Sequence, residues 1–546
     1  MRFLLNGQNV ELEKGQDYRA AAEQLAYDRR ALAIRVRGNT LPLTAMPTEG
    51  EEAQILTYDD EEGRRVYERS LRFVFLCAVR RVMPGVHVRI EHSIRRGLYI
   101  RPDAPVTHAT AEAIAEEMRR IVREDIPFEK RAVSRDDAIE YFASHGEEDK
   151  VRLLKYRAFE QFQLYECDGM LEYLYGEMAP STGYVPVFDV KLLLPGLALL
   201  LPDRPDASKA SELAELPKLM RTFSESARWN EILGVSNVAD LNEMVKKRTL
   251  REFIRVNEVL HDMSINDIAR KFLESGARLI LIAGPSSSGK TTLAHRLSIA
   301  LRALGHQPMK LSLDDYYIDR DKLPVDENGE CDLETPDALD LGLIGEHLVA
   351  LLQGRKIDAP EYDFVTGKRK QQTHELSVEP GQPILIEGIH ALNERLTRDV
   401  PRSQKFMIYI SALTTINLDD HNRIRTTDAR LLRRMVRDYQ FRGTSPEETM
   451  NMWDSVRAGE EKHIFPYQEY ADVMFNSSLV YELAILKKYA YPMLIRIPPE
   501  SKHYTLARRV VKFLNYVQSA DVENEIPLNS ILREFVGGSC FYKALD

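Results

Sequence analysis

The hydrophobic pattern of the first 60 residues consists of short apolar runs around one helical stretch. Short runs bounded by turn residues predict strands, and recurrence at three and four positions predicts a helix. The expected elements are strands at 3–5, 8–12 and 33–36 and a helix at 18–27. This order predicts a small α+β module.

The pattern then becomes helical over residues 64–82, and residues 86–90 alternate between apolar and polar side chains. Alternation indicates a strand with one buried face. Helical and strand-like segments follow to about residue 201, with a helix expected over 111–123. A second α+β unit is therefore expected here.

A polar, proline-bearing stretch at 201–208 indicates a linker, and helical periodicity over 218–275 indicates a helical connector. From residue 279 onward apolar strands alternate with helical segments, which predicts a mostly parallel sheet covered by helices on both faces. The expected strands are 279–283, 309–313, 383–386, 406–410 and 494–497.

These changes divide the chain into five predicted parts, and its length of 546 residues agrees with several cores. The parts are a small module at 1–60, an α+β domain at 61–205, a helical connector at 206–275, an α/β domain at 276–505 and a C-terminal helical segment at 506–546.

Composition narrows the class of protein. A formal net charge of −10 argues against a nucleic-acid partner, because phosphate backbones attract an excess of lysine and arginine. No segment approaches the run of about eighteen apolar residues that a membrane span needs. The four cysteines lack C-x-x-C spacing, which argues against a disulfide framework or a zinc site. We expect a cytoplasmic protein.

The most informative motif follows the 279–283 strand and matches G-x-x-x-x-G-K-[ST]. Its glycines let backbone N–H groups close around phosphates, and its lysine and hydroxyl reach phosphate and Mg²⁺. The preceding strand disfavours a flexible glycine-serine linker. The motif predicts binding of ATP or GTP with Mg²⁺. Its expected phosphate-binding residues are Gly284, Ser286, Ser287, Ser288, Gly289, Lys290, Thr291 and Thr292.

Charged residues after later strands suggest what happens to the phosphate. Asp314 follows the second strand of the sheet, where a carboxylate can accept a hydroxyl proton, unless it belongs to a solvated turn. Glu387 ends another strand and is placed to hold Mg²⁺, unless it caps a helix. Arg430, Arg434 and Arg437 share a helical face that could neutralise a transferring phosphoryl group or be solvated.

Several signatures in the same order give residues 278 to about 500 a resemblance to the uridine kinase and phosphoribulokinase family. Besides the phosphate loop they are Ser312-Leu313-Asp314-Asp315-Tyr316-Tyr317, Pro336-Asp337-Ala338-Leu339-Asp340, Tyr362-Asp363-Phe364, Glu387-Gly388, Arg433-Arg434-Met435-Val436-Arg437-Asp438 and Tyr470-Ala471-Asp472-Val473. The resemblance implies transfer of a γ-phosphate to a ribose-like 5′-hydroxyl.

The resemblance also implies roles for single residues. Lys290, Asp314 and Arg437 correspond to catalytic positions, with Asp314 as the general base. Thr291, Asp314 and Glu387 correspond to Mg²⁺ partners. The implied substrate contacts are Tyr317, Glu334, Tyr362 and Arg434.

The chain departs from the family where the acceptor base is recognised. Gly367 stands where the pyrimidine nucleoside kinases place a histidine, and Thr444 and Met452 replace an expected arginine and glutamine. Phosphoryl transfer is therefore better supported than a particular nucleoside. A kinase of another small alcohol or sugar phosphate and an RNA-associated nucleotide-binding regulator stay open as alternatives, as does homo-oligomerisation.

The N-terminal half resembles the amino-terminal (TGS, β-grasp) and editing modules of threonyl-tRNA synthetase. The resemblance rests on His145-Gly146-Glu147-Glu148-Asp149-Lys150-Val151 and Pro180-Ser181-Thr182-Gly183. The editing site of that family needs an H-x-x-x-H pair, for which this chain has Phe73 and Cys77, and Leu174 and Met178 replace a later cysteine and histidine. The resemblance implies a regulatory or binding module without the hydrolytic site. The expected fold is an α/β P-loop kinase domain preceded by a β-grasp module and an α+β domain.

Overall fold

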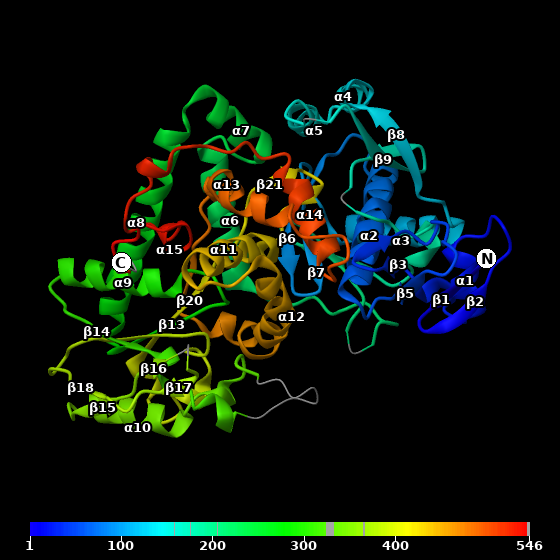
Figure 1. Ribbon diagram of the computed structural model, residues 1–546. Helices are drawn as coiled ribbons and strands as arrows, with labels where there is room; N and C mark the ends of the chain where they lie inside the picture. Colours follow the sequence, from blue (N-terminus) through cyan, green and yellow to red (C-terminus); the bar gives the residue numbers. More distant parts are fainter. Residues whose placement is uncertain (158, 175, 205, 324–331, 364–365, 543–546) are drawn as a thin grey trace.

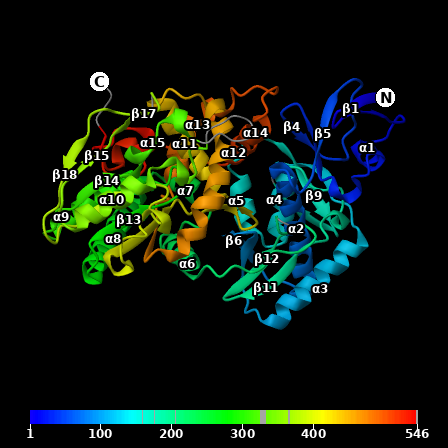
Figure 2. The same cartoon turned by 90° about the horizontal axis from the view of Figure 1, so that it is seen from below.

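The computed structural model describes residues 1–542 except 158, 175, 205, 324–331 and 364–365. In Figure 1 the first 200 residues lie on the right and the parallel sheet lies on the left. Figure 2 gives the same division from below, with helix α12 (Pro446–His463) between the two groups of elements. Among the described residues, every helix is too short or too polar to cross a membrane.

The first elements form one five-stranded sheet with the order β2-β1-β5-β3-β4. They are β1 (Arg2–Leu5), β2 (Gln8–Glu11), α1 (Tyr18–Gln24), β3 (Ala33–Val36), β4 (Asn39–Leu41) and β5 (Glu52–Leu56). The expected strand, strand, helix, strand order is confirmed. The Asp17 carboxylate accepts a hydrogen bond from the Arg19 amide and begins α1, while Tyr18 is buried against Phe3.

The next elements form two antiparallel sheets, β10-β9-β8 and β11-β12-β7-β6, around a long buried helix. They are α2 (Glu61–Val82), β6 (Val88–Ile94), β7 (Gly97–Pro102), α3 (His108–Glu124), β8 (Glu129–Ser134), α4 (Arg135–Ser144), α5 (Glu148–Leu154), β9 (Gln161–Cys167), β10 (Met170–Glu172), β11 (Asp189–Leu193) and β12 (Gly196–Leu200). The helices expected at 64–82 and 111–123 and the strand at 86–90 are confirmed as α2, α3 and β6.

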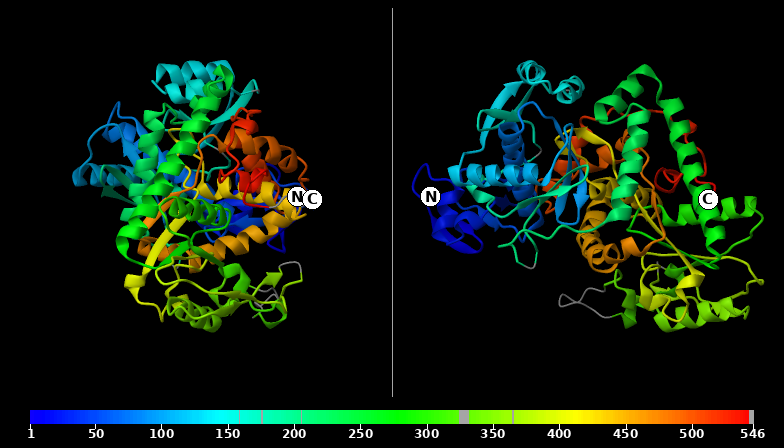
Figure 3. Two further views of the ribbon diagram at one scale, coloured as in Figure 1. Left: turned by 90° about the vertical axis from the view of Figure 1, so that its left-hand side faces the viewer. Right: turned by 180° about the vertical axis from the view of Figure 1, so that it is seen from behind.

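Three helices follow, as the periodicity over 218–275 predicts. They are α6 (Pro217–Ile232), α7 (Val238–Lys247) and α8 (Leu250–Ser275). Asn237 begins α7 with a capping box, and α8 packs on α9 (Lys290–Ala303). In the right-hand view of Figure 3, these helices lie in the half of the molecule that carries the C label. They therefore pack beside the parallel sheet.

The sheet of the C-terminal half is parallel throughout, with the order β14-β19-β13-β20-β23. Its strands are β13 (Leu279–Ala283), β14 (Met309–Ser312), β19 (Ile384–Glu387), β20 (Lys405–Ser411) and β23 (Val473–Asn476). Ile280 and Ile282 face one hydrophobic core, and Leu279 and Leu281 face another. Both faces of the sheet are therefore covered, as predicted.

The strand expected at 494–497 is wrong. Residue Leu494 ends helix α13 (Glu482–Leu494), and the fifth strand is β23. Ala490 and Leu494 are both buried four positions apart, so this apolar run forms one face of a helix rather than a strand. β23 has only one fully buried residue, Phe475, because it lies at the edge of the sheet.

Further elements cover the sheet and carry its loops. They are α10 (Leu341–Leu352), β15 (Ile357–Ala359), β16 (Tyr362–Asp363), β17 (Lys368–Arg369), β18 (His374–Leu376), β21 (Asn417–Asp419), β22 (Asn422–Arg423), α11 (Thr426–Phe441), α12, α13, α14 (Tyr504–Leu514) and α15 (Arg533–Val536). Residues 506–542 contain helix but also long irregular stretches, so the helical segment expected there is only partly helical.

The two halves meet at a group of buried charges that we call the Lys150 cluster: Lys150, Glu147, Glu172, Asp419 and His421. Glu172 is fully buried, Lys150 is 2% exposed and His421 is 7% exposed. His421 Nδ1 lies 2.5 Å from Glu172 Oε2, and Lys150 Nζ lies 3.5 Å from Glu172 Oε1. Residues before 200 and residues after 400 thus share one ionic network.

The charges of the cluster stabilise one another. Burial and the Lys150 charge lower the pKa of His421, but Glu172 and Glu147 outweigh them and raise it to about 9. Lys150 Nζ also lies 2.8 Å from His421 Nδ1. That nitrogen cannot both accept from Lys150 and donate to Glu172, and we assign donation to Glu172 because Lys150 has Glu147 as its own partner. Although Glu147, Glu172 and His421 could hold a metal ion, the Lys150 ammonium already supplies the cation.

Candidate active site

The phosphate loop connects β13 to α9, and two of its glycines are required by geometry. A Cβ on Gly284 would lie 2.0 Å from the Ile410 carbonyl oxygen on the neighbouring strand. Gly289 has a φ of 89°, in the left-handed region that favours glycine, and it begins α9. The loop therefore turns sharply and directs the N-terminal end of α9 toward the edge of the sheet.

The polar groups of the loop fit an anionic ligand. Ser287 Oγ and Ser288 Oγ are buried and lack a hydrogen-bond partner among the described residues. Within the same described residues, Lys290 Nζ donates only to the Pro285 carbonyl, at 3.3 Å. With the positive end of α9 beside them, these groups match what a phosphate chain would satisfy.

Glu387 ends β19 where the parallel register brings three strands to the same edge. Its Oε1 lies 3.1 Å from Ser312 Oγ and 3.4 Å from Thr291 Oγ1. Burial and the Asp314 charge raise the pKa of Glu387 to about 7, against the effect of Lys290. Oxygen donors with two adjacent carboxylates fit a divalent cation such as Mg²⁺.

Asp314 lies in a short 3₁₀ turn directly after β14 and is exposed. The surrounding protein raises the pKa of its carboxyl by limiting hydration, and the positive charges of Lys290, Arg442 and Arg437 oppose the rise. The structure therefore brings together the predicted residues Lys290, Asp314 and Arg437. The structure also adds Arg442 to the charges around Asp314, although no sequence motif indicates this residue.

The arginines of α11 separate into two pairs. Arg430 and Arg433 are almost completely buried, where Arg430 binds Glu460 through two bonds of 2.6 and 2.7 Å and Arg433 binds Glu482. Arg434 donates to Ser286 Oγ of the phosphate loop at 2.8 Å, and Arg437 pairs with its neighbour Asp438. The expected three-residue stripe is therefore wrong for Arg430, whose guanidinium is held by a buried carboxylate.

The predicted acceptor residues lie beside Asp314. Burial raises the pKa of Tyr317 well above its usual value, and the charges of Asp314 and Glu334 add to the rise, so these groups are neighbours. The rings of Tyr317 and Tyr362 are 5.6 Å apart. Burial raises the pKa of Glu334 to about 7, opposed by Arg434 and Lys290. Phe364 of the Tyr-Asp-Phe signature lies outside the described residues.

Gly367 lies in the turn between β16 and β17, with a φ of 69°. Its carbonyl accepts a hydrogen bond of 2.8 Å from the Arg320 amide, and a Cβ would lie 3.1 Å from the Arg320 side chain. A histidine here would need a strained left-handed backbone. This turn is therefore shaped for glycine.

His390 is a neighbour of the site that the sequence analysis does not include. It is 1% exposed, and burial lowers its pKa to about 3, so the ring is neutral. Among the described residues its ring nitrogens have no hydrogen-bond partner within bonding geometry. Its position three residues after Glu387 is the sequence signal that could have placed it near the site. A histidine that only packs in the core would occupy the same kind of position.

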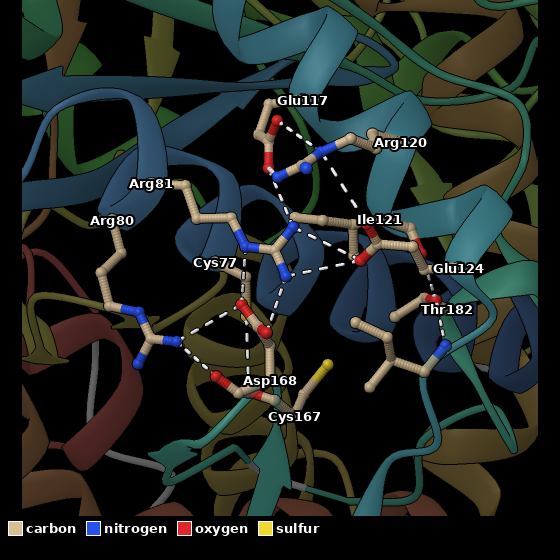
Figure 4. Close-up of polar contacts among 11 residues, drawn as sticks. Cys77, Arg80, Arg81, Glu117, Arg120, Ile121, Glu124, Cys167, Asp168 and Thr182 are labelled. Atoms are coloured by element: carbon tan, nitrogen blue, oxygen red, sulfur yellow. Dashed lines mark hydrogen bonds and ion pairs between the residues drawn. The ribbon is translucent and has the colours of Figure 1, made fainter.

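The four positions that the sequence analysis compares with an editing site come together in one hydrophobic core. Phe73, Cys77, Leu174 and Met178 are each at most 3% exposed. Cys77 donates through Sγ to the Cys167 carbonyl oxygen at 3.7 Å, and burial together with Cys167 raises its pKa. Figure 4 shows ion pairs of neighbouring charged residues beside this thiol. The side chains at these positions pack against one another.

A phosphate loop after the central strand of a parallel sheet, with carboxylates at the same sheet edge, defines a P-loop kinase domain. Residues 279–483 match the sequence profile of the Phosphoribulokinase / Uridine kinase family. The uridine kinase of Staphylococcus haemolyticus is 33% identical over 197 residues, which are 36% of this chain and 86% of the relative. The uridine kinase of Lactobacillus johnsonii is 32% identical over 197 residues, 36% of this chain and 84% of the relative. The chain belongs to this family.

Solved structures of related name superpose weakly. A possible uridine kinase from Bacillus stearothermophilus matches 39% of this chain and 97% of its own, with a TM-score of 0.27 and 20% identity. A D-glycerate 3-kinase from Cryptococcus neoformans matches 49% of this chain and 87% of its own, with a TM-score of 0.21 and 14% identity.

Proposed function

We propose that this protein is an ATP-dependent nucleoside kinase that transfers the γ-phosphate to a ribose 5′-hydroxyl, as the curated uridine kinases' names suggest. The observation that carries the proposal is the meeting of Asp314, Lys290 and Arg437 at the edge of the sheet beside the phosphate loop. A general base, a phosphate-binding cation and a charge-neutralising arginine are the groups that phosphoryl transfer needs.

In this proposal Asp314 accepts the proton of the acceptor hydroxyl, and the oxygen of that hydroxyl attacks the γ-phosphorus. The bond between the γ-phosphorus and the bridging oxygen breaks, and ADP leaves with the electron pair. Lys290, Arg434 and Arg437 stabilise the charge that develops on the phosphoryl oxygens. Thr291, Asp314 and Glu387 would hold Mg²⁺, which neutralises phosphate charge when bound.

The acceptor is proposed to lie against Tyr317 and Tyr362, with a ribose hydroxyl bonded to Glu334. Gly367 leaves the base unassigned, because its turn has no histidine to contact a pyrimidine. A small alcohol or a sugar phosphate is the alternative acceptor.

For the rest of the chain, we propose the division into parts at 1–60, 61–205, 206–275, 276–505 and 506–546, with a cytoplasmic location. The first two parts are proposed as TGS-like and editing-like binding modules. The strand, strand, helix, strand order of residues 2–36 supports this assignment.

A screen of acceptors tests the function. Wild-type protein with MgATP is incubated with nucleosides, sugars, sugar phosphates and small alcohols, and ADP release is measured. The Asp314→Asn variant should lose transfer by roughly 100-fold or more while still binding MgADP. Asp321→Asn removes an exposed carboxylate that pairs with Lys368, and it serves as the matched control. Equal activity of Asp314→Asn and wild type would refute Asp314 as the base.

A further inference from the structure

Residues 530–542, which we call the strap, lie along the first turns of α9. A Cβ on Gly289 would meet Ile531 Cγ2 at 2.6 Å, and Thr292 Oγ1 donates to Glu534 Oε2 at 2.6 Å. The ring of Phe541 stacks on His295 at 4.9 Å. Positions 289, 292 and 295 are three residues apart, so the strap follows one face of α9 from the phosphate loop onward.

Besides Glu387, two carboxylates bond to the phosphate loop, and they differ in their partners. Glu460 accepts a hydrogen bond from the Ser286 amide at 3.1 Å, and Arg430 and Arg457 neutralise it. Glu534 bonds to Thr292, but no arginine or lysine of the described residues makes an ion pair with it. Glu460 is therefore a structural support, whereas the Glu534 charge is balanced mainly by the positive end of α9.

That end of the helix is where a P-loop receives phosphates. A carboxylate bonded to Thr292 there would repel the phosphate chain of a bound nucleotide. The strap and a triphosphate thus compete for the same positive region.

The strap is built so that one part is fixed and another can move. Phe535 is fully buried beneath Arg433, whose guanidinium lies 5.1 Å from the ring centre. Gly537 and Gly538 both have positive φ angles, of 93° and 75°, and Tyr542 beyond them is 41% exposed. Two such glycines allow residues 539–542 to swing while α15 stays in place.

We propose that the strap is an autoinhibitory element: Glu534, covered by Tyr542, occupies Thr292 of the phosphate loop, and the donor nucleotide must displace both. This inference rests on the proposed kinase function for the identity of the donor. Tyr542 Oη lies 3.5 Å from Thr292 Oγ1 and completes the cover. On nucleotide binding, the Glu534 side chain rotates away and residues 539–542 swing outward.

The test is calorimetric titration with MgADP, which requires no acceptor. Glu534→Gln keeps the size of the side chain and removes its charge, so MgADP should bind roughly fivefold more tightly than to wild type. Asp521→Asn removes a charge from an 87%-exposed side chain of the same C-terminal region and should bind like wild type. Hydrogen–deuterium exchange of wild-type residues 537–542 should rise when MgADP is added.

The possible outcomes separate the strap from the kinase function. Equal MgADP affinity of wild type and Glu534→Gln, with unchanged exchange, overturns the strap proposal alone. Weaker binding by Glu534→Gln with reduced exchange overturns it as well, because the strap would then form part of the donor site. If wild type and both variants bind no nucleotide, the proposed function fails and the strap proposal fails with it.

Discussion

The edge of the parallel sheet and the Lys150 cluster both concentrate charge, but they satisfy it differently. In the cluster, the carboxylates of Glu172 and Glu147 face the cations of Lys150 and His421, and all four are held inside the protein. At the sheet edge, burial and the Asp314 charge raise the pKa of Glu387, and the hydroxyls of Ser287 and Ser288 lack partners among the described residues. A complete set of partners indicates a structural role, and an incomplete set indicates a place for a ligand.

If this distinction holds, the largest effect on activity comes from the sheet edge. Lys290→Ala should lower the rate of phosphoryl transfer by about 1,000-fold, because it removes a positive charge aimed at the phosphates. Stability should change little, since within the described residues Lys290 bonds only to the Pro285 carbonyl. Steady-state kinetics and a thermal melt measure the two effects.

The control is Lys322→Ala, which removes a 70%-exposed lysine paired with Asp319. It should keep both activity and stability. A Lys290→Ala protein that melts far below wild type would contradict the division between ligand-binding and structural charge.

The next effect belongs to the Lys150 cluster. Lys150→Met should lower the free energy of unfolding by about 3–5 kcal/mol, because it removes one of the two cations that face the carboxylates of Glu147 and Glu172. Urea denaturation measures the loss. Lys191→Met, at an exposed pair with Asp189, should change stability by less than about 1 kcal/mol. Similar stability of the two variants would show that the cluster does not hold the halves together.

A smaller effect is expected from pH. The pKa of His421 is raised to about 9 by Glu172 and Glu147, so its contribution to stability is complete below the unfolded value near 6.5 and is lost as pH rises through 9. The shift corresponds to about 3 kcal/mol at most. Asp419, Glu334 and Glu387, whose pKa values are raised to about 7, titrate around pH 7, so urea denaturation between pH 8 and 9.5 follows the loss of the His421 contribution.

His421→Gln provides the comparison for this pH series. It should be less stable than wild type at pH 7 and should lose less stability than wild type up to pH 9.5. Parallel profiles of stability against pH for the two proteins would show that a group other than His421 titrates in this range.

The sequence could predict the parts whose signal is local. The phosphate loop, the strands before Asp314 and Glu387, and the helices α2, α3 and α6 to α8 all follow from periodicity or motif. The prediction of a strand at 494–497 was wrong because a short apolar run is compatible with both a strand and a buried helix end. Arg430 was misplaced because helical spacing gives the face of a residue but not the carboxylate, Glu460, that holds it.

Long-range contacts could not be predicted at all. The pairing of Glu172 with His421 joins residues 249 positions apart, and Glu534 meets Thr292 over 242 positions. Neither contact leaves a pattern in a single sequence, because the residues around each partner do not indicate which distant residue it meets. Only the fold shows that the first is buried and that the second lies on the phosphate loop.

The ammonium group of Lys150 has a consequence for how the protein responds to its surroundings. A lysine is part of the chain and cannot be removed by a chelator, so the joint between the halves does not depend on the supply of divalent ions. The sheet edge, whose carboxylates are suited to such an ion, does depend on it. Metal depletion would therefore abolish the proposed phosphoryl transfer while the two halves stay joined.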